Sequence, residues 1–157
     1  MKRHSPSIAA AAILALACTL HSAAQAPQER GYWRAASNTA SSITGDITIG
    51  DAKLTIDYRA YSLARIRSLK PEEVAAVFDE DVNTAGDGSL YRLIVPAGTR
   101  LLHKNTLCGT DDTQWMATYL SGKTLQVAFF SGEDAPTFTV DAISNSQRVC
   151  GTYTFVR

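Results

Sequence analysis

Apolar and polar residues alternate along most of this chain, and that alternation restricts its fold more than any other feature. It is clearest in two runs joined by a short turn with glycine, residues 114–120 and 123–130. A period of two places successive side chains on opposite faces of an extended strand. Two such runs separated by a short turn predict a β-hairpin.

The same alternation recurs at the spacing of a β-meander. Residues 42–49 and 53–58 flank Gly50 and Asp51, which predicts a type II′ hairpin. The next run, 60–67, is expected to face inward at its even-numbered positions and outward at its arginines. Further strands are expected at residues 89–95, 137–143 and 148–156.

One segment departs from the two-residue period. Within residues 69–78, Pro71 suits the first turn of a helix, and the two glutamates that follow it complement the positive end of the helix dipole. Three apolar residues spaced for one helical face follow, Val74, Val77 and Phe78. We expect one short helix that caps one end of the sheet.

These elements together predict an all-β fold. About eight strands at meander spacing, with one short helix, fit a small antiparallel β-barrel, because closure of the sheet removes its exposed edges. A two-sheet β-sandwich fits the same pattern and is the alternative.

The first 24 residues have the order of a secretory signal peptide. Lys2 and Arg3 precede the apolar run 8–20, and small residues precede an expected cleavage site before Gln25. We therefore expect residues 1–24 to be a signal peptide and residues 25–157 to form a single domain that is periplasmic or secreted. The alternative is a lipoprotein signal, in which a lipidated Cys18 would anchor the domain to the outer membrane.

Cys108 and Cys150 each stand in a Cys-Gly-Thr triplet, beyond the expected signal peptide. Two cysteines of an exported protein usually pair, because the compartment is oxidising. Their spacing is far from the Cys-x-x-Cys of a redox motif, and a zinc site would need His103 and an acid such as Asp111 as further ligands. We predict a Cys108–Cys150 disulfide, no metal and no cofactor.

The charged residues argue against several classes of function. Without Lys2 and Arg3, thirteen basic residues stand against fifteen acidic ones with no basic stripe, so a nucleic-acid partner is not expected. A membrane contact is expected only if Cys18 is lipidated.

The acidic loop 79–88 matches a calcium-loop template only in part, because the template's glycine and its bidentate glutamate are missing. We interpret it as a solvated loop.

Few residues of the chain form a pattern that is typical of a catalytic site. A Ser-His-Asp triad would have to use His103, the one histidine beyond the expected signal peptide. His103 and Cys108 could form a nucleophile pair only if the disulfide is absent. Asp111 and Asp112 are adjacent, so on a strand they would point to opposite faces instead of across a cleft. We expect no enzyme, and a hydrolase built around His103 is the alternative.

Gly31-Tyr32-Trp33 resembles the Gly-x-Trp signature of lipocalins. In that family the tryptophan closes the barrel floor beside an arginine of the last strand, so the resemblance implies Arg148 or Arg157 as its partner. In size, export signal and strand density the chain is also similar to small exported bacterial barrels that include periplasmic lysozyme inhibitors. Those inhibitors carry a Ser-Gly-rich loop, whereas Ser121-Gly122-Lys123 is expected to be a hairpin turn.

The expected function is that of a non-enzymatic binding domain of the bacterial envelope. Its partner would be a protein, bound in the manner of an inhibitor, or a small apolar ligand inside the barrel. A purely structural envelope component is a further alternative. A filled interior would direct the search for a site to the loops 79–88 and 109–113.

Overall fold

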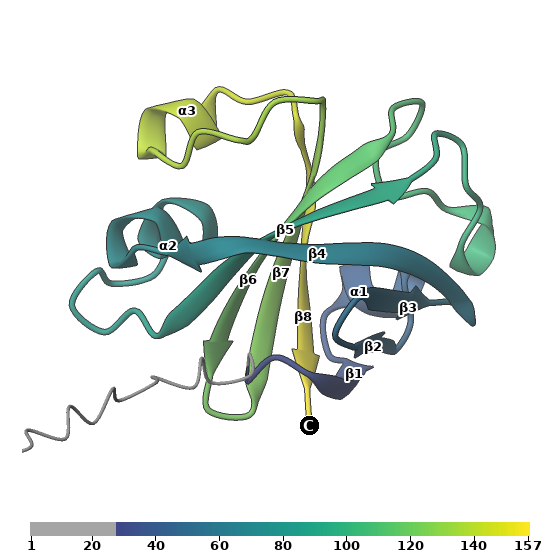
Figure 1. Ribbon diagram of the computed structural model, residues 1–157, viewed down its shortest axis with the longest axis horizontal. Coiled ribbons are helices and arrows are strands. Elements are labelled where there is room, and N and C mark those ends of the chain that lie inside the picture. Colours follow the sequence, from purple (N-terminus) through teal and green to yellow (C-terminus); the bar gives the residue numbers. More distant parts are fainter. Residues whose placement is uncertain (1–27) are drawn as a thin grey trace, which may run out of the picture.

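Eight antiparallel strands pair in sequence order and close on themselves, because β1 pairs with both β2 and β8 (Figure 1). The computed structural model describes residues 28–157; the expected signal peptide and Cys18 lie outside the described residues. The predicted antiparallel barrel is confirmed, and the sandwich alternative is wrong. The strands are β1 (Gly31–Ala35), β2 (Ile47–Ile49), β3 (Lys53–Ile56), β4 (Arg59–Leu69), β5 (Asp87–Val95), β6 (Thr113–Ser121), β7 (Thr124–Ser131) and β8 (Val149–Val156).

Helices occupy three of the connections. The predicted helix is confirmed as α2 (Pro71–Phe78), with Glu73 accepting a hydrogen bond from the backbone N–H of Lys70 at 2.8 Å. The expectation of a single helix is wrong, since α1 (Asn38–Ile43) and α3 (Val140–Ser144) are helical as well, and η1 (Leu102–Lys104) is a short 3-10 turn.

The predicted strand 42–49 is correct only in its second half. The Ser37 hydroxyl accepts a hydrogen bond from the N–H of Ala40 at 3.1 Å and so caps the start of α1. Gly45, at φ +60°, then turns the chain into β2. The helix cap thus outweighs the apolar alternation of this run. The strand β1, which precedes the helix, was not predicted from the sequence.

The predicted strand 137–143 is wrong for a similar reason. The Thr139 hydroxyl accepts a hydrogen bond from the N–H of Ala142 at 3.2 Å, which caps α3. The alternating threonines before α3 belong to an irregular segment. The last predicted strand is confirmed as β8.

From Arg59 to Arg65, the inward face of β4 is the opposite of the predicted one; beyond the bulge, Arg67 lies on the outer face as predicted. Asp57 and Tyr58 form a two-residue turn with φ values of 47° and 60°, and Ile56 pairs with Arg59 across it. Tyr61 therefore faces inward beside Leu54, while Ile66 is 51% exposed. The β2–β3 connection also differs from the predicted type II′ turn, because Gly50 lacks the positive φ that this turn requires.

Two apolar cores lie on opposite sides of the sheet. The first fills the barrel interior; its largest side chains include Trp33, Ile47, Leu54, Met116, Phe129 and Phe155. The second lies on the outer face of β5–β7, beneath α2 and α3, which Figure 1 shows together on one side of the barrel. Both faces of β6 are thus buried, which accounts for its nearly continuous apolar sequence.

One end of the barrel is closed by connecting segments. Ala40 of α1, together with Leu101 and Leu107 from the β5–β6 connection, packs into the interior core. The disulfide lies at this same end and ties the connection to β8. A small apolar ligand inside the barrel would have to displace these side chains.

Candidate functional site

The two cysteines form the predicted disulfide. Cys108 and Cys150 are bonded, with their Cα atoms 4.9 Å apart. Cys108 therefore has no free thiol to act as a nucleophile. In the part of the chain that the structure describes, no hydrogen bond joins His103 to a hydroxyl or carboxylate that could complete a triad, and its backbone adopts φ 51° in an exposed turn.

The tryptophan of the Gly-x-Trp segment is the anchor of the barrel end at which the described chain begins. Trp33 has 0% exposure, and the guanidinium carbon of Arg157 lies 4.3 Å from the centre of its ring. Of the two arginines considered from the sequence, Arg157 is thus the partner; Arg148 instead donates to the carbonyl of Ser131.

Arg157 also fixes the segment that precedes β1. Its guanidinium donates to the carbonyls of Gln28 and Arg30 at 3.0 and 3.1 Å, and the Trp33 indole N–H donates to the carbonyl of Glu29 at 2.7 Å. These three bonds hold residues 28–30 across the end of the barrel. They determine where the Glu29 side chain points.

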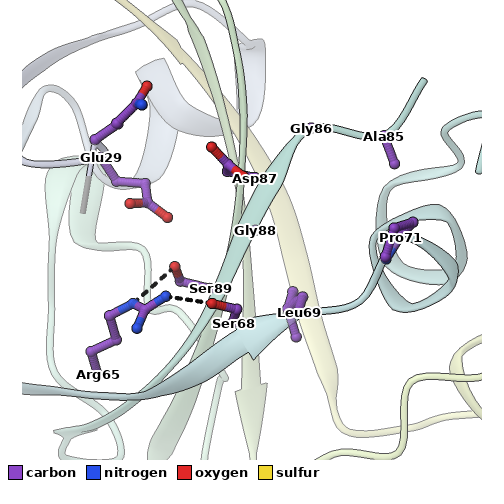
Figure 2. A pocket seen from close by; sticks show the side chains of 11 residues that line it. Glu29, Arg65, Ser68, Leu69, Pro71, Ala85, Gly86, Asp87, Gly88 and Ser89 are labelled. Carbon is purple, nitrogen blue, oxygen red and sulfur yellow. Dashed lines mark hydrogen bonds between the residues drawn. The ribbon is translucent and has the colours of Figure 1, made fainter. Parts of the chain in front are cut away.

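A pocket of about 330 Å³ opens at this end, between the 28–30 segment and the β4–β5 pair. We call it the Glu29 pocket. Figure 2 shows the carboxylate of Glu29 and the guanidinium of Arg65 pointing into the same space from two sides. Its polar and charged lining is Gln28, Glu29, Arg65, Ser68, Asp87 and Ser89.

A β-bulge in β4 brings two of these side chains to the inner face. Arg65 pairs with Tyr91 and Ser68 pairs with Ser89, and the register shifts between Arg65 and Arg67. Without the extra residue, side chains three apart would point to opposite faces. The Arg65 guanidinium donates to the hydroxyls of Ser89 at 3.2 Å and Ser68 at 2.8 Å, which orient it along the pocket.

Glu29 is a buried carboxylate. Only 3% of its surface is exposed, and it accepts a hydrogen bond from the Thr118 hydroxyl at 3.0 Å. The ion pairs within residues 28–157 are Arg30–Asp51 and Arg67–Glu73, and neither involves Glu29. A buried charge without a counterion is unfavourable unless hydrogen bonds or a ligand compensate it.

The phenol of Tyr91 lies behind Glu29. Burial, and secondarily the charge of Glu29, raise the pKa of Tyr91 to about 12. Its hydroxyl is buried without a hydrogen-bond partner among the described residues, as are those of Tyr61 and Tyr153.

Two glycines shape the opposite wall of the pocket. A Cβ on Gly88 would come within 2.7 Å of a Val74 methyl group and 2.9 Å of the Thr118 carbonyl. A Cβ on Gly86 would come within 2.8 Å of the Leu120 carbonyl. Gly86 thus allows the chain to approach β6 closely, and Gly88 allows β5 to approach both β6 and α2.

The two loops indicated by the sequence differ in their relation to this pocket. The end of the acidic loop 79–88 lines it through residues 85–88. In the loop 109–113, the Asp112 carboxylate accepts a hydrogen bond from the N–H of Ala97 at 2.7 Å and so fixes the loop backbone. No three potential metal ligands from His, Cys, Asp and Glu gather anywhere in residues 28–157.

Sequence reasoning did not find this site. It assigned Arg65 to the outer face and gave Glu29 no role.

Searches against protein-family models, curated proteins and solved structures found no match to this chain. Among the helices of the described region, none has the length and apolar character needed to cross a bilayer.

Proposed function

We propose that this chain is an exported, non-enzymatic binding domain of the bacterial envelope that binds the amino-terminal end of a peptide in the Glu29 pocket. The observation that carries the proposal is a buried carboxylate with no counterion, held at the inner end of an open pocket. A peptide ammonium would supply that counterion. Charge-assisted hydrogen bonds of this kind are among the stronger polar interactions.

Arg65 gives the pocket a second recognition group. Two of its five N–H donors are used by Ser68 and Ser89, which leaves three that can bind a ligand. They can donate to a backbone carbonyl or a terminal carboxylate of the same ligand. The site thus suits a ligand that carries a positive group and an acceptor a few ångströms apart, as every short peptide does.

Other features support export and a binding role. The signal-like order of residues 1–24 predicts secretion, and the Cys108–Cys150 bond fits an oxidising compartment. The Trp33–Arg157 stack is the arrangement that the lipocalin resemblance implied. The filled interior favours a site at the barrel end over an apolar ligand inside it.

Titration with three related peptides tests the proposal. We expect trialanine to bind with shifts of the Ser89 and Thr118 amides in a ¹H–¹⁵N NMR spectrum. N-acetyl-trialanine, which lacks the ammonium, and trialanine amide, which lacks the carboxylate, separate the roles of Glu29 and Arg65. Loss of the charge-assisted bond is expected to weaken binding of the acetylated peptide about ten- to hundredfold.

Glu29→Gln is the informative variant, since glutamine can still accept the Thr118 hydrogen bond but carries no charge. It should bind trialanine and its acetylated form equally weakly. Glu72→Gln, on the exposed face of α2, is the matched control and should behave as wild type. Unchanged discrimination in Glu29→Gln, or no binding of trialanine by the wild-type protein, would exclude the peptide-end proposal.

A further inference from the structure

Exposed aromatic side chains gather at one place on this protein. Within the described residues, the exposed large apolar side chains include just two aromatic ones, Tyr32 at 56% and Tyr58 at 100% exposure. Both line a second depression of about 250 Å³ on the outer face of β1–β3, the small sheet at the lower right of Figure 1. The remaining aromatic rings are buried or half-buried.

Tyr58 is held outward by an unfavourable backbone. It is the second residue of the β3–β4 turn, where both Asp57 and Tyr58 have positive φ values. Glycine or asparagine is favoured in such a turn, because a side chain with a Cβ is disfavoured in the left-handed region. The chain thus keeps a large aromatic ring, in contact with solvent, at a position where glycine would be more stable.

Tyr32 is fixed in place before any ligand arrives. Its hydroxyl donates a hydrogen bond to Asp46, whose second carboxylate oxygen accepts the backbone N–H of Ala35 at 2.9 Å. The bond to Asp46 is the main reason that the pKa of Tyr32 is raised. A ring held in one orientation loses little entropy when it stacks against a ligand.

Hydroxyl groups continue the row that Tyr32 begins. Tyr32 pairs with Thr48, and Thr48 pairs with Thr55, so the three side chains share the outer face of neighbouring strands about 4.8 Å apart. The carboxylate of Asp57 lines the same depression and forms no hydrogen bond or ion pair within the described chain. Donors, acceptors and an aromatic surface therefore lie within one small area.

This set of groups matches the chemistry of a sugar ring. A pyranose has C–H groups on one face, which stack on an aromatic ring, and hydroxyls around its edge, which need both donors and acceptors. A quaternary ammonium would use the rings and carboxylates but leave the threonine hydroxyls without a role. The threonine row is the observation that favours a saccharide.

We infer that the outer face of β1–β3 is a saccharide-binding site, in which Tyr32 and Tyr58 stack against the sugar and Thr48, Thr55 and Asp57 bind its hydroxyls. This site lies on other strands than the Glu29 pocket and does not depend on the function proposed for that pocket. The Glu29→Gln variant, which is expected to lose peptide binding, should bind saccharides as the wild-type protein does.

An NMR titration of the full domain tests the inference with four probes: chitotetraose, cellotetraose, maltotetraose and tetramethylammonium. At least one tetrasaccharide is expected to shift the Thr48 and Thr55 amides saturably. Tyr58→Gly removes the ring and relieves the turn, so we expect it to weaken sugar binding about tenfold while raising Tm by a few degrees.

The control is Ile94→Ala, which removes an exposed apolar side chain elsewhere on the barrel and should bind sugar as wild type does. Tyr32→Phe, which keeps the ring but loses the Asp46 bond, should bind with intermediate affinity. Absence of shifts with all three sugars, shifts with tetramethylammonium alone, or undiminished sugar binding in Tyr58→Gly would overturn the inference.

Discussion

Removal of the Cys108–Cys150 disulfide is expected to lower the free energy of unfolding by about 4 kcal/mol. The bond closes a loop of 42 residues, and the loss of loop-closure entropy in the unfolded chain predicts this magnitude. It joins the segment before β6 to β8, and both cysteines pack against the interior core. Urea unfolding of the Cys108→Ala/Cys150→Ala variant measures the effect.

Reduced wild-type protein is the control, because it lacks the cross-link but keeps both cysteine side chains. It should unfold at nearly the same urea concentration as the double alanine variant, because both lack the cross-link. A midpoint unchanged from that of the oxidised protein would show that the sulfur–sulfur bond does not constrain this fold.

Trp33→Ala is expected to destabilise the domain by about 3–5 kcal/mol. The indole is completely buried in the interior core, and its loss leaves a cavity at the end of the barrel where the Glu29 pocket opens. It also removes the hydrogen bond to the Glu29 carbonyl and the stacking surface of Arg157. Thermal unfolding checks the stability, and the trialanine titration checks the expected loss of binding as the 28–30 segment loosens.

Two arginine variants separate the contribution of the Trp33–Arg157 stack to stability from that of an exposed ion pair in the same segment. Arg157→Ala removes the stacked cation and two carbonyl contacts and should cost about 1–2 kcal/mol. Arg30→Ala removes an exposed ion pair with Asp51 and should cost under about 1 kcal/mol. Equal effects of these two substitutions would contradict the role assigned to the Trp33–Arg157 stack.

Residue alternation was sufficient to predict the barrel because one face of each strand packs in the interior. It located the β6–β7 hairpin and β8 correctly, whereas the cysteine pair was predicted from the oxidising compartment expected of an exported chain. It failed where a local interaction outweighed the pattern. Ser37 and Thr139 cap helices within runs that alternate like strands, and two non-glycine residues in the Asp57–Tyr58 turn reverse the inward face of β4.

The Glu29 pocket was out of reach for a different reason. It depends on a bulge that places Arg65 and Ser68 on one face, and on long-range contacts from Arg157 to the 28–30 segment. The Asp57–Tyr58 turn places Arg65 on the inner face, and the bulge after Arg65 then brings Ser68 to the same face. Neither feature is marked by a distinctive residue type. Tyr58, likewise, stood in the predicted strand 53–58, although the structure places it in the β3–β4 turn and leaves it fully exposed.

Apolar side chains fill the barrel interior, and we therefore expect water to be excluded from it. Burial raises the pKa of Tyr153 to about 12, and burial together with Glu29 does the same for Tyr91. Because the folded pKa exceeds the ordinary value of 10.0, the neutral phenols stabilise the fold fully below about pH 10. That stabilisation is lost as the pH rises from 10 to 12.

A ¹³C NMR titration of tyrosine Cζ, assigned with Tyr91→Phe and Tyr153→Phe, measures both ionisations. The filled interior predicts that Tyr91 and Tyr153 stay neutral until pH values near 12, or ionise only when the domain unfolds. Ionisation of both at about pH 10 in the folded protein would contradict it, because water would then reach the barrel interior.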